Sequence, residues 1–318
     1  MIDSELLSRN VLTIEREIAS QPHSWRMAVE LARSLASNLP RRGERLALIG
    51  CGTSYFVAQA AAILREDAGH GESDAFAASE APLDRPYDAV LAISRSGATT
   101  EVVRALERVA PGVETMAVCG VAGSPVAEIA ARSVILDFAD EDAIVQTRFA
   151  TAVLALLRSH FADAIRDVPD RAEEVLAAPL PIDPLAFDRF VFLGSGWGVG
   201  VAHEAALKLR EMAGVWSESY PVMEYRHGPI SATNRKTLVW AIGALDGNVL
   251  EGAGQAGATV IDSGRDPMVE LVMVQRAAVA IAGARGLDPG NPPNLTRSVV
   301  LNGRFDALSE TTITEGDR

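Results

Sequence analysis

Residues 90–107 read VLAISRSGATTEVVRALE and join a short apolar run, a hydroxyl-rich turn and an amphipathic stretch. The run at 90–93 is bounded by turn residues and is too short for a helix, so it predicts a buried strand. Thr99 and Thr100 then stand where a helix N-cap belongs, just before apolar residues at helical spacing. Such a strand–turn–helix unit directs free backbone N–H groups and the positive end of the helix dipole at one point. The stretch therefore predicts a phosphate site, although an ordinary capped turn has the same pattern.

A second stretch of this kind lies earlier in the chain. Residues 46–49 (LALI) predict another buried strand, followed by the turn GCGTS at 50–54 and an Ala-rich helix from about Phe56. Two such turns at the C-terminal ends of two parallel strands suit one ligand at a switch point of the sheet. Neither turn has the GxGxxG or GxxxxGK[ST] pattern, so neither a dinucleotide nor a nucleoside triphosphate is favoured.

The bulk composition excludes several classes of protein. The chain of 318 residues suffices for two domains, and 48% apolar with 22% charged residues is typical of a globular protein. The net charge of −13 disfavours non-specific nucleic-acid binding. No apolar run approaches the ~20 residues that span a bilayer, and the N-terminus lacks a signal-peptide pattern. Two cysteines make neither a disulfide framework nor a cysteine-rich metal site. We therefore expect a cytoplasmic protein that binds no nucleic acid, membrane or metal.

The remainder of the first half alternates strands with helices, which favours a parallel, doubly wound α/β sheet. Apolar periodicity predicts helices over 4–39, interrupted at Gln21-Pro22, and over 140–176. Residues 179–184 (PLPIDP) form the clearest linker, so we place the domains at 1–178 and 179–318. Further strands are predicted at 76–80, 115–119 and 133–136.

The second half repeats this order. A strand at 189–193 leads into the turn GSGWG at 194–198 and a helix over 199–212. Strands are also predicted at 237–242 and 259–262, and residues 269–273 either close the second sheet or lead into a helix. The two halves thus look like a duplication, in which only the first keeps a phosphate-type turn.

The helix over 199–212 carries a charged stripe. Glu204, Lys208 and Glu211 lie at i, i+4 and i+7 and so share one face. Charged residues spaced in this way more often form salt bridges on a solvent-exposed helix face. Here the helix is apolar nearly all round, so we expect the stripe to face a cleft. His227 follows in a polar-aromatic loop; a lone histidine is more often a surface residue, but an acid, an amine and an imidazole together can shuttle protons on a sugar carbonyl.

These stretches resemble the sugar isomerase (SIS) domain family, and most closely the isomerase half of glucosamine-6-phosphate synthase. The resemblance implies two tandem SIS domains, each a parallel sheet flanked by helices in three αβα layers, in a homodimer with a shared active site. It extends from Glu17 to Leu301 and is carried by GCGTS at 50–54, SE at 79–80, ISRSGAT at 93–99, FLGSG at 192–196, EAALKLRE at 204–211 and HGP at 227–229.

The resemblance also implies roles for individual residues. Glu211 corresponds to the base that moves a proton between C1 and C2, His227 to the ring-opening histidine that the partner subunit often supplies, and Lys208 to the helix lysine. This chemistry needs no metal or redox cofactor, because the carboxylate and the imidazole transfer the protons. The phosphate site maps onto Ser94, Ser96 and Thr99, and the sugar is bordered by Cys51, Gly52, Thr53, Ser54 and Gln146.

The chain departs from the synthase at several positions. Arg95 stands between the two turn serines, where the family has glutamine, and we expect it to add a cation near the phosphate. Arg297 stands where the synthase has its active-site lysine, and an arginine is too basic to form a Schiff base readily. Position 2 is Ile2 rather than a nucleophilic cysteine, and no glutaminase domain precedes the isomerase half, so glutamine is not expected as the ammonia source.

We therefore expect an enzyme that acts on a hexose 6-phosphate, either an aminosugar-phosphate deaminase or a plain aldose–ketose isomerase. Two alternatives stay open. One is a sugar-phosphate sensor that binds without turnover, which the replacement at Arg297 favours. The other is ammonia-dependent synthesis of glucosamine 6-phosphate.

Overall fold

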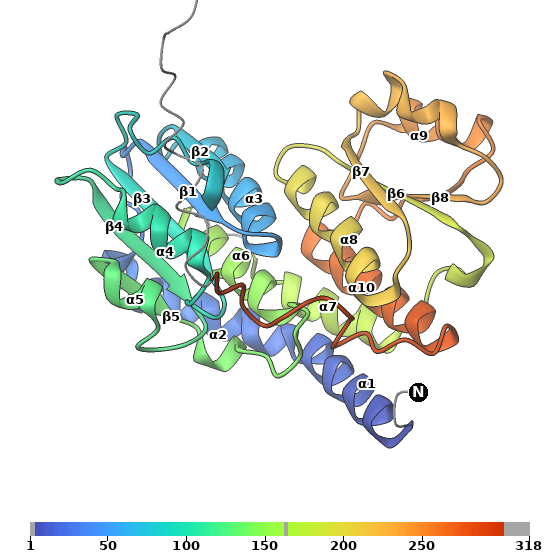
Figure 1. Cartoon of the computed structure of the whole chain (residues 1–318). Helices are drawn as coiled ribbons and strands as arrows, with labels where there is room; N and C mark the ends of the chain where they lie inside the picture. Colours follow the sequence, from blue (N-terminus) through green and yellow to red (C-terminus); the bar gives the residue numbers. More distant parts are fainter. Residues whose placement is uncertain (1–3, 162–164, 302–318) are drawn as a thin grey trace, which may run out of the picture.

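The chain forms two parallel sheets with a layer of helices between them (Figure 1). The computed structural model describes residues 4–161 and 165–301. Strand order is β2-β1-β3-β4-β5 in the first sheet and β7-β6-β8-β9 in the second, so the second repeats the order of the first four strands of the first. The strands are β1 (Leu46–Gly50), β2 (Ser73–Ala77), β3 (Ala89–Ser94), β4 (Glu114–Cys119) and β5 (Arg132–Ile135), then β6 (Arg189–Gly194), β7 (Ser217–Pro221), β8 (Thr237–Ile242) and β9 (Thr259–Ile261).

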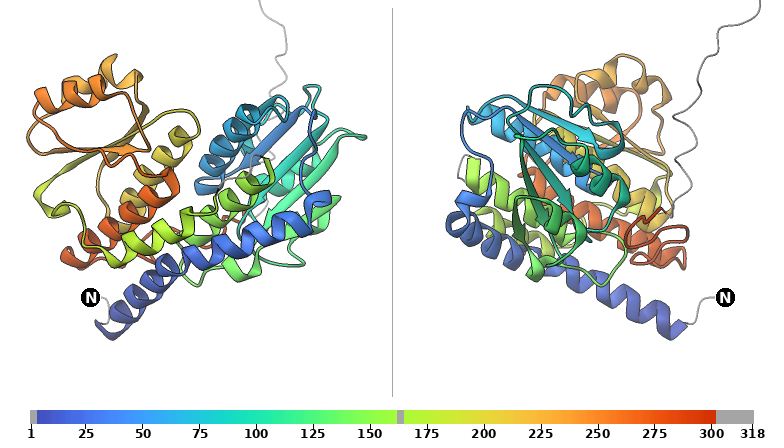
Figure 2. Two further views of the ribbon diagram at one scale, coloured as in Figure 1. Left: turned by 180° about the vertical axis from the view of Figure 1, so that it is seen from behind. Right: turned by 60° about the vertical axis from the view of Figure 1, so that its left-hand side comes forward.

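The helices sandwich each sheet. One face of the first sheet packs against α2, α3 and α6, and the other against α4 and α5; α8 and α10 cover the inner face of the second sheet, and α9 covers its outer face. The inner faces of both sheets share one continuous core, while α1 extends beyond the body of the molecule (Figure 2). The helices are α1 (Ser4–Ala19), α2 (Gln21–Ser34), α3 (Thr53–Asp67), α4 (Thr100–Glu107), α5 (Pro125–Ile129), α6 (Arg148–Phe161), α7 (Val168–Ala177), α8 (Gly198–Ala213), α9 (Gly247–Gln255) and α10 (Pro267–Ala284).

Helix α10 is long and apolar enough, by length and composition alone, to cross a membrane. Its 18 residues have a mean hydropathy of 1.4, but 72% of them are buried inside the protein. It packs against α8, α7 and α1. The apolar side chains of α10 are therefore explained by its burial in the core. Residues 269–273 belong to this helix and not to a strand.

Three of the predicted elements differ in detail. The strand predicted at 76–80 is β2, Ser73–Ala77, and residues 78–80 form a short 3-10 helix instead. The helix predicted from residue 140 begins only at Arg148, because the Glu141 carboxylate accepts the N–H groups of Thr147 and Arg148 and caps the first turn. The polar-aromatic loop predicted ahead of His227 begins with an edge strand, β7. Its Ser217 pairs with Phe190 of β6. Polar residues on both faces of an edge strand hide the usual alternation.

Gly200 sets how closely α8 approaches α3. A Cβ at this position would lie 2.6 Å from the Phe56 carbonyl oxygen and 2.7 Å from the Ala60 nitrogen, both of them backbone atoms. We expect Gly200→Ala to lower the free energy of unfolding by ~1–3 kcal/mol, because the two helices must separate to admit the methyl group. Urea unfolding followed by circular dichroism measures this change.

Gly252→Ala is the matched control, since Gly252 also lies within a helix, α9, but has no atom within 4 Å of its built Cβ. This variant is expected to gain roughly 0.5–1 kcal/mol, the ordinary preference of a helix for alanine. Equal effects of the two substitutions would show that the α3–α8 approach is not tight.

Candidate active site

The predicted phosphate turn follows β3 at the C-terminal edge of the first sheet. Gly97 has a φ of +62°, and a Cβ there would lie 1.9 Å from the Ser124 hydroxyl oxygen, so only glycine fits. Ser94 Oγ accepts from the Gly97 N–H at 3.2 Å, and Ser96 Oγ accepts from the Ala98 N–H at 3.3 Å. Because both hydroxyl oxygens act as acceptors in these bonds, their protons are left to donate to a ligand.

Helix α4 begins where the sequence predicts. Thr99 holds the N-cap position with extended backbone (φ −66°, ψ 120°), although its side chain makes no capping hydrogen bond. The Thr100 N–H donates to the Val299 carbonyl at 3.1 Å, and the Leu301 N–H donates to Thr100 Oγ1 at 2.9 Å. The C-terminal segment therefore returns to the first sheet and lies across the start of α4 (Figure 1).

The second predicted turn lies at the same edge of the sheet, because β1 and β3 are neighbours. Gly52 occupies the N-cap of α3 with a φ of +54°, and Ser54 is buried in the first turn. Cys51 is half-buried, and burial followed by the charge of Glu101 raises its pKa to about 11. Its thiol is therefore protonated at neutral pH and is no nucleophile.

The charged stripe of α8 meets this turn from the second half of the chain. Lys208 Nζ donates to Thr53 Oγ1 at 3.0 Å, and the Thr53 hydroxyl donates to Glu204 Oε1 at 3.2 Å. Lys208 is also 3.3 Å from Glu204 Oε1 and donates to Glu211 Oε2. Glu204 and Lys208 are 2% and 0% exposed, so this part of the stripe is buried against α3 and does not face the expected cleft.

The three charges of this stripe are not equivalent. Burial lowers the pKa of Lys208, but the charges of Glu204 and Glu211 outweigh burial and leave it raised, so the amine stays protonated. Burial raises the pKa of Glu204, and Lys208 opposes the shift. Glu211 keeps 19% of its side chain exposed and lines a pocket of about 320 Å³ between α8 and the C-terminal segment. Glu211 is thus the carboxylate of the stripe that a ligand can reach.

Arg95 does not lie where the sequence predicts. Its side chain is buried and turns away from the phosphate turn, donating to the carbonyls of Ala143 (2.8 Å), Ile144 (2.9 Å) and Arg297 (3.4 Å). Glu141 Oε2 lies 3.8 Å from its guanidinium. The expected cation beside the phosphate is therefore corrected: Arg95 holds the 140–147 loop and the C-terminal segment together.

Arg297 takes part in the same junction. Its guanidinium pairs with the Asp140 carboxylate, at 2.6 Å to Oδ2, and donates to the Glu141 carbonyl. This arginine therefore fastens the C-terminal segment to the loop instead of presenting an amine to a substrate.

Gln146 and His227 are the remaining predicted site residues. Gln146 is half-buried, and its Oε1 atom is buried without a hydrogen-bond partner in the described part of the chain, which costs ~1–3 kcal/mol unless a ligand or water satisfies it. His227 is exposed, and no hydrogen bond or ion pair joins its side chain to Glu211 or to any other described residue. In a single chain, the 50–54 turn contacts the stripe of α8 and lies beside the 94–99 turn through β1 and β3, whereas the side chain of His227 bonds to none of them.

Glu17 fixes the 140–147 loop from the other side. Its Oε1 atom accepts the N–H groups of Asp142 (2.7 Å) and Ala143 (3.3 Å). The residue is 3% exposed, and burial, reinforced by the nearby Glu141, raises its pKa from 4.5 to about 7. The folded protein therefore holds a proton at Glu17 more tightly than the unfolded chain does.

This raised pKa predicts a pH-dependent stability. The contribution of Glu17 is most favourable below its unfolded pKa and is lost as the pH rises through the folded value, from about 4.5 to about 7. Across this pH window, the free energy of unfolding of wild type is expected to fall relative to that of Glu17→Gln. Outside the window, the difference between the two proteins is expected to stay constant. Urea unfolding of both proteins at about pH 4.5 and about pH 8 tests the difference; a gap that does not change with pH contradicts it.

Sequence reasoning missed the residues that close the site from the C-terminal side. The 140–147 loop is held by hydrogen bonds and ion pairs of Asp140, Glu141 and Glu17. The C-terminal segment is held by the hydroxyl of Thr100. No local pattern announces these contacts, since Asp140 and Arg297 are separated by 157 positions.

Known proteins resemble this chain in sequence and in fold. The SIS domain family matches residues 41–159, which contain the whole first sheet. Among curated proteins, the chain is similar to the isomerizing glutamine–fructose-6-phosphate aminotransferases of Thermotoga maritima (24% identical, 83% of this chain and 53% of the relative) and Halobacterium salinarum (27%, 90% and 58%). The chain spans about half the length of these relatives.

Solved structures extend the likeness over both sheets. The chain is similar to a glucosamine-6-phosphate deaminase of Thermotoga maritima, with 26% identity, a TM-score of 0.75, and coverage of 92% of this chain and 100% of that one. A tagatose-6-phosphate ketose/aldose isomerase of Escherichia coli shares the fold, with 21% identity, a TM-score of 0.72, and coverage of 92% and 96%.

The expected tandem pair of SIS domains is corrected by these findings, because the family matches the chain once. The second sheet repeats the strand order of the first, but it has four strands instead of five and no Ser-x-Ser turn after β8. The likeness to an SIS domain therefore lies in residues 41–159.

Proposed function

We propose that this protein is a phosphosugar isomerase that acts on an aminosugar 6-phosphate as a deaminase. One observation carries the proposal: the carboxylates and the ammonium of α8 are joined through Thr53 to the sheet edge that bears the Ser94–Thr99 turn. This continuity supports a single site that combines hydroxyl donors for a phosphate with a proton-transferring carboxylate. The likeness to the Thermotoga maritima deaminase over nearly the whole chain supports it.

In the proposed reaction, the hydroxyls of Ser94, Ser96 and Thr99 hold the phosphate. Glu211 takes the C2 proton of the open-chain aminosugar, and delivery of a proton to C1 leaves a C2 imine. Water then adds to the imine and ammonia departs, which gives the ketose phosphate. Lys208 donates to both Glu211 Oε2 and Thr53 Oγ1, and so holds the Glu211 carboxylate in position.

Ring opening is assigned to the partner subunit's His227 in a homodimer. His227 is exposed and no hydrogen bond or ion pair joins its side chain to Glu211 in the described chain, which favours a role between subunits. Sedimentation together with the loss of activity in His227→Asn tests this assignment. An active monomer would contradict it.

Arg297 argues against a synthase that holds its sugar through a Schiff base. A guanidinium is a poor Schiff-base nucleophile, and here it is also paired with Asp140. Synthesis from ammonium would be the reverse of the proposed deamination and would pass through the same C2 imine and Glu211.

The direct test is to incubate the protein with glucosamine 6-phosphate and to assay ammonia and fructose 6-phosphate. Equal amounts of both products support the deaminase. A ketose phosphate formed from an unaminated hexose 6-phosphate, with no ammonia from the aminosugar, would show a plain aldose–ketose isomerase. Thermal stabilisation by sugar phosphates without any product would show a sensor.

A further inference from the structure

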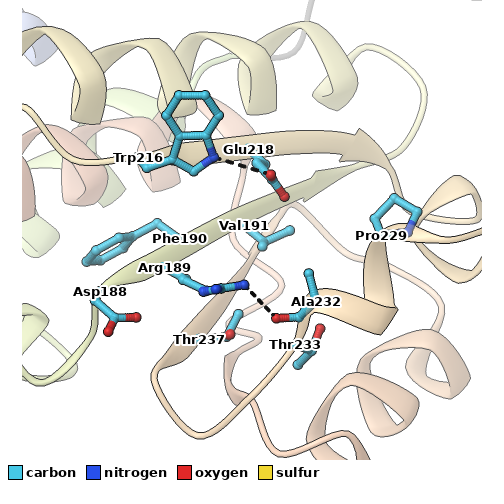
Figure 3. Close-up of a pocket in the computed structure, with 10 residues that line it drawn as sticks. All are labelled: Asp188, Arg189, Phe190, Val191, Trp216, Glu218, Pro229, Ala232, Thr233 and Thr237. Carbon is cyan, nitrogen blue, oxygen red and sulfur yellow. Dashed lines mark hydrogen bonds between the residues drawn. The ribbon is translucent and has the colours of Figure 1, made fainter.

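A pocket of about 400 Å³ opens at the second sheet (Figure 3). Its lining comes from the starts of β6, β7 and β8 and from the segment that follows His227. This volume lies in the range of small-molecule sites. The residues lining it are Asp188, Arg189, Phe190, Val191, Trp216, Glu218, Pro229, Ala232, Thr233 and Thr237.

Trp216 gives the pocket an aromatic wall. Its side chain is 75% exposed, whereas Trp25 and Trp240 are buried in the core. The indole N–H points to the Glu218 carboxylate at 3.4 Å, so the ring and the carboxylate stand side by side. A large aromatic ring left open to solvent in a pocket is a stacking surface for an apolar or cationic face.

The polar groups of the pocket are both acceptors and donors. Glu218 accepts from Trp216 through Oε1 and from the Tyr220 hydroxyl through Oε2 (3.1 Å), which leaves a further lone pair on each oxygen. Arg189 crosses the pocket and donates from Nη1 to the Ala232 carbonyl at 2.9 Å, which uses one of its five N–H groups. Asp188 adds a second, exposed carboxylate.

We propose that this pocket is a second saccharide site, which binds an unphosphorylated sugar and prefers an amino sugar. The ring of a pyranose offers an apolar face to Trp216, and its neighbouring hydroxyls pair with the carboxylate of Glu218 and the guanidinium of Arg189. Two carboxylates against one guanidinium disfavour a phosphate and favour an ammonium, which the aromatic face also attracts.

The site is separate from the one proposed for catalysis, and its occupancy does not depend on that proposal. The pocket touches the second half of the chain only, and Pro229 in its wall is two residues from His227. A bound sugar would therefore rest against the segment that carries the histidine.

Calorimetric titration of the full chain with glucosamine, glucose and glucosamine 6-phosphate tests the proposal. We expect wild type to bind glucosamine more tightly than glucose, and Trp216→Ala to weaken glucosamine binding about tenfold through loss of the stacking surface. Glu218→Gln is expected to remove the preference for glucosamine over glucose while keeping glucose binding. Met223→Ala is the matched control, since Met223 is an exposed neighbour (49%) outside the pocket.

Three results would overturn the proposal. One is equal affinity of wild type and Trp216→Ala for glucosamine, which would place any binding elsewhere. Another is the absence of binding by either unphosphorylated sugar. The third is a dimer in which iodide fails to quench the exposed tryptophan, which would show that a second copy covers the pocket. Matching thermal melts of the variants confirm that each is folded, so that a loss of binding is not a loss of structure.

Discussion

Glu211→Gln is expected to lower kcat by about 10³-fold with little change in KM, because a positioned general base contributes on the order of 10²–10⁴. The amide keeps the size of the side chain and an oxygen that can still accept from Lys208, so the local structure is preserved. It has no basic lone pair with which to take a proton from carbon. Steady-state rates with glucosamine 6-phosphate, measured as ammonia release, give the effect.

Glu251→Gln is the control for this prediction. Glu251 is an exposed glutamate on α9 whose carboxylate accepts from Gln255, far from the stripe of α8. Its substitution is expected to leave kcat within about twofold, as for an ordinary surface change. If Glu211→Gln turns over every sugar phosphate at the wild-type rate, Glu211 is not the base.

The order of strands and helices was predictable from the sequence because most strands are buried on both faces. Residues 46–49 and 90–93 are continuous apolar runs between turns, and both are strands of the first sheet. Strand β7 was missed because Ser217 and Ser219 use their hydroxyls to bond the Ala206 carbonyl and His203 on α8, so a polar sequence packs against a helix. The pattern of apolar residues carries no sign of such bonds.

The site was predictable in its local parts and not in its long-range ones. The turns at 50–54 and 94–99 and the spacing of the α8 stripe are short motifs with a geometric meaning. The bond between Lys208 and Thr53 spans 155 positions and depends on how α8 packs on α3. The resemblance placed Arg95 at the phosphate by position alone, whereas its side-chain direction follows from the carbonyls of Ala143 and Ile144.

Lys208→Met is expected to lower the free energy of unfolding by ~3–5 kcal/mol, because it removes one partner of a buried ion pair and leaves the other uncompensated. Lys208 is fully buried, and its three donors meet Thr53, Glu204 and Glu211. Methionine has nearly the same length and no charge. Urea unfolding at neutral pH measures the loss.

The other lysine of the chain, Lys236, provides the control, because it is exposed and its ammonium donates to the Ala186 carbonyl. Lys236→Met is expected to change stability by no more than about 0.5 kcal/mol.

A double variant separates charge from packing. In Glu204→Gln/Lys208→Met no full charge stays buried at this position, so the loss should be well below the sum of the two single losses. The loss in Lys208→Met should also shrink as the pH falls, because Glu204, whose pKa burial already raises, can then take up a proton and become neutral. If the two single losses add and neither depends on pH, Lys208 contributes volume rather than charge to the stability of the folded protein.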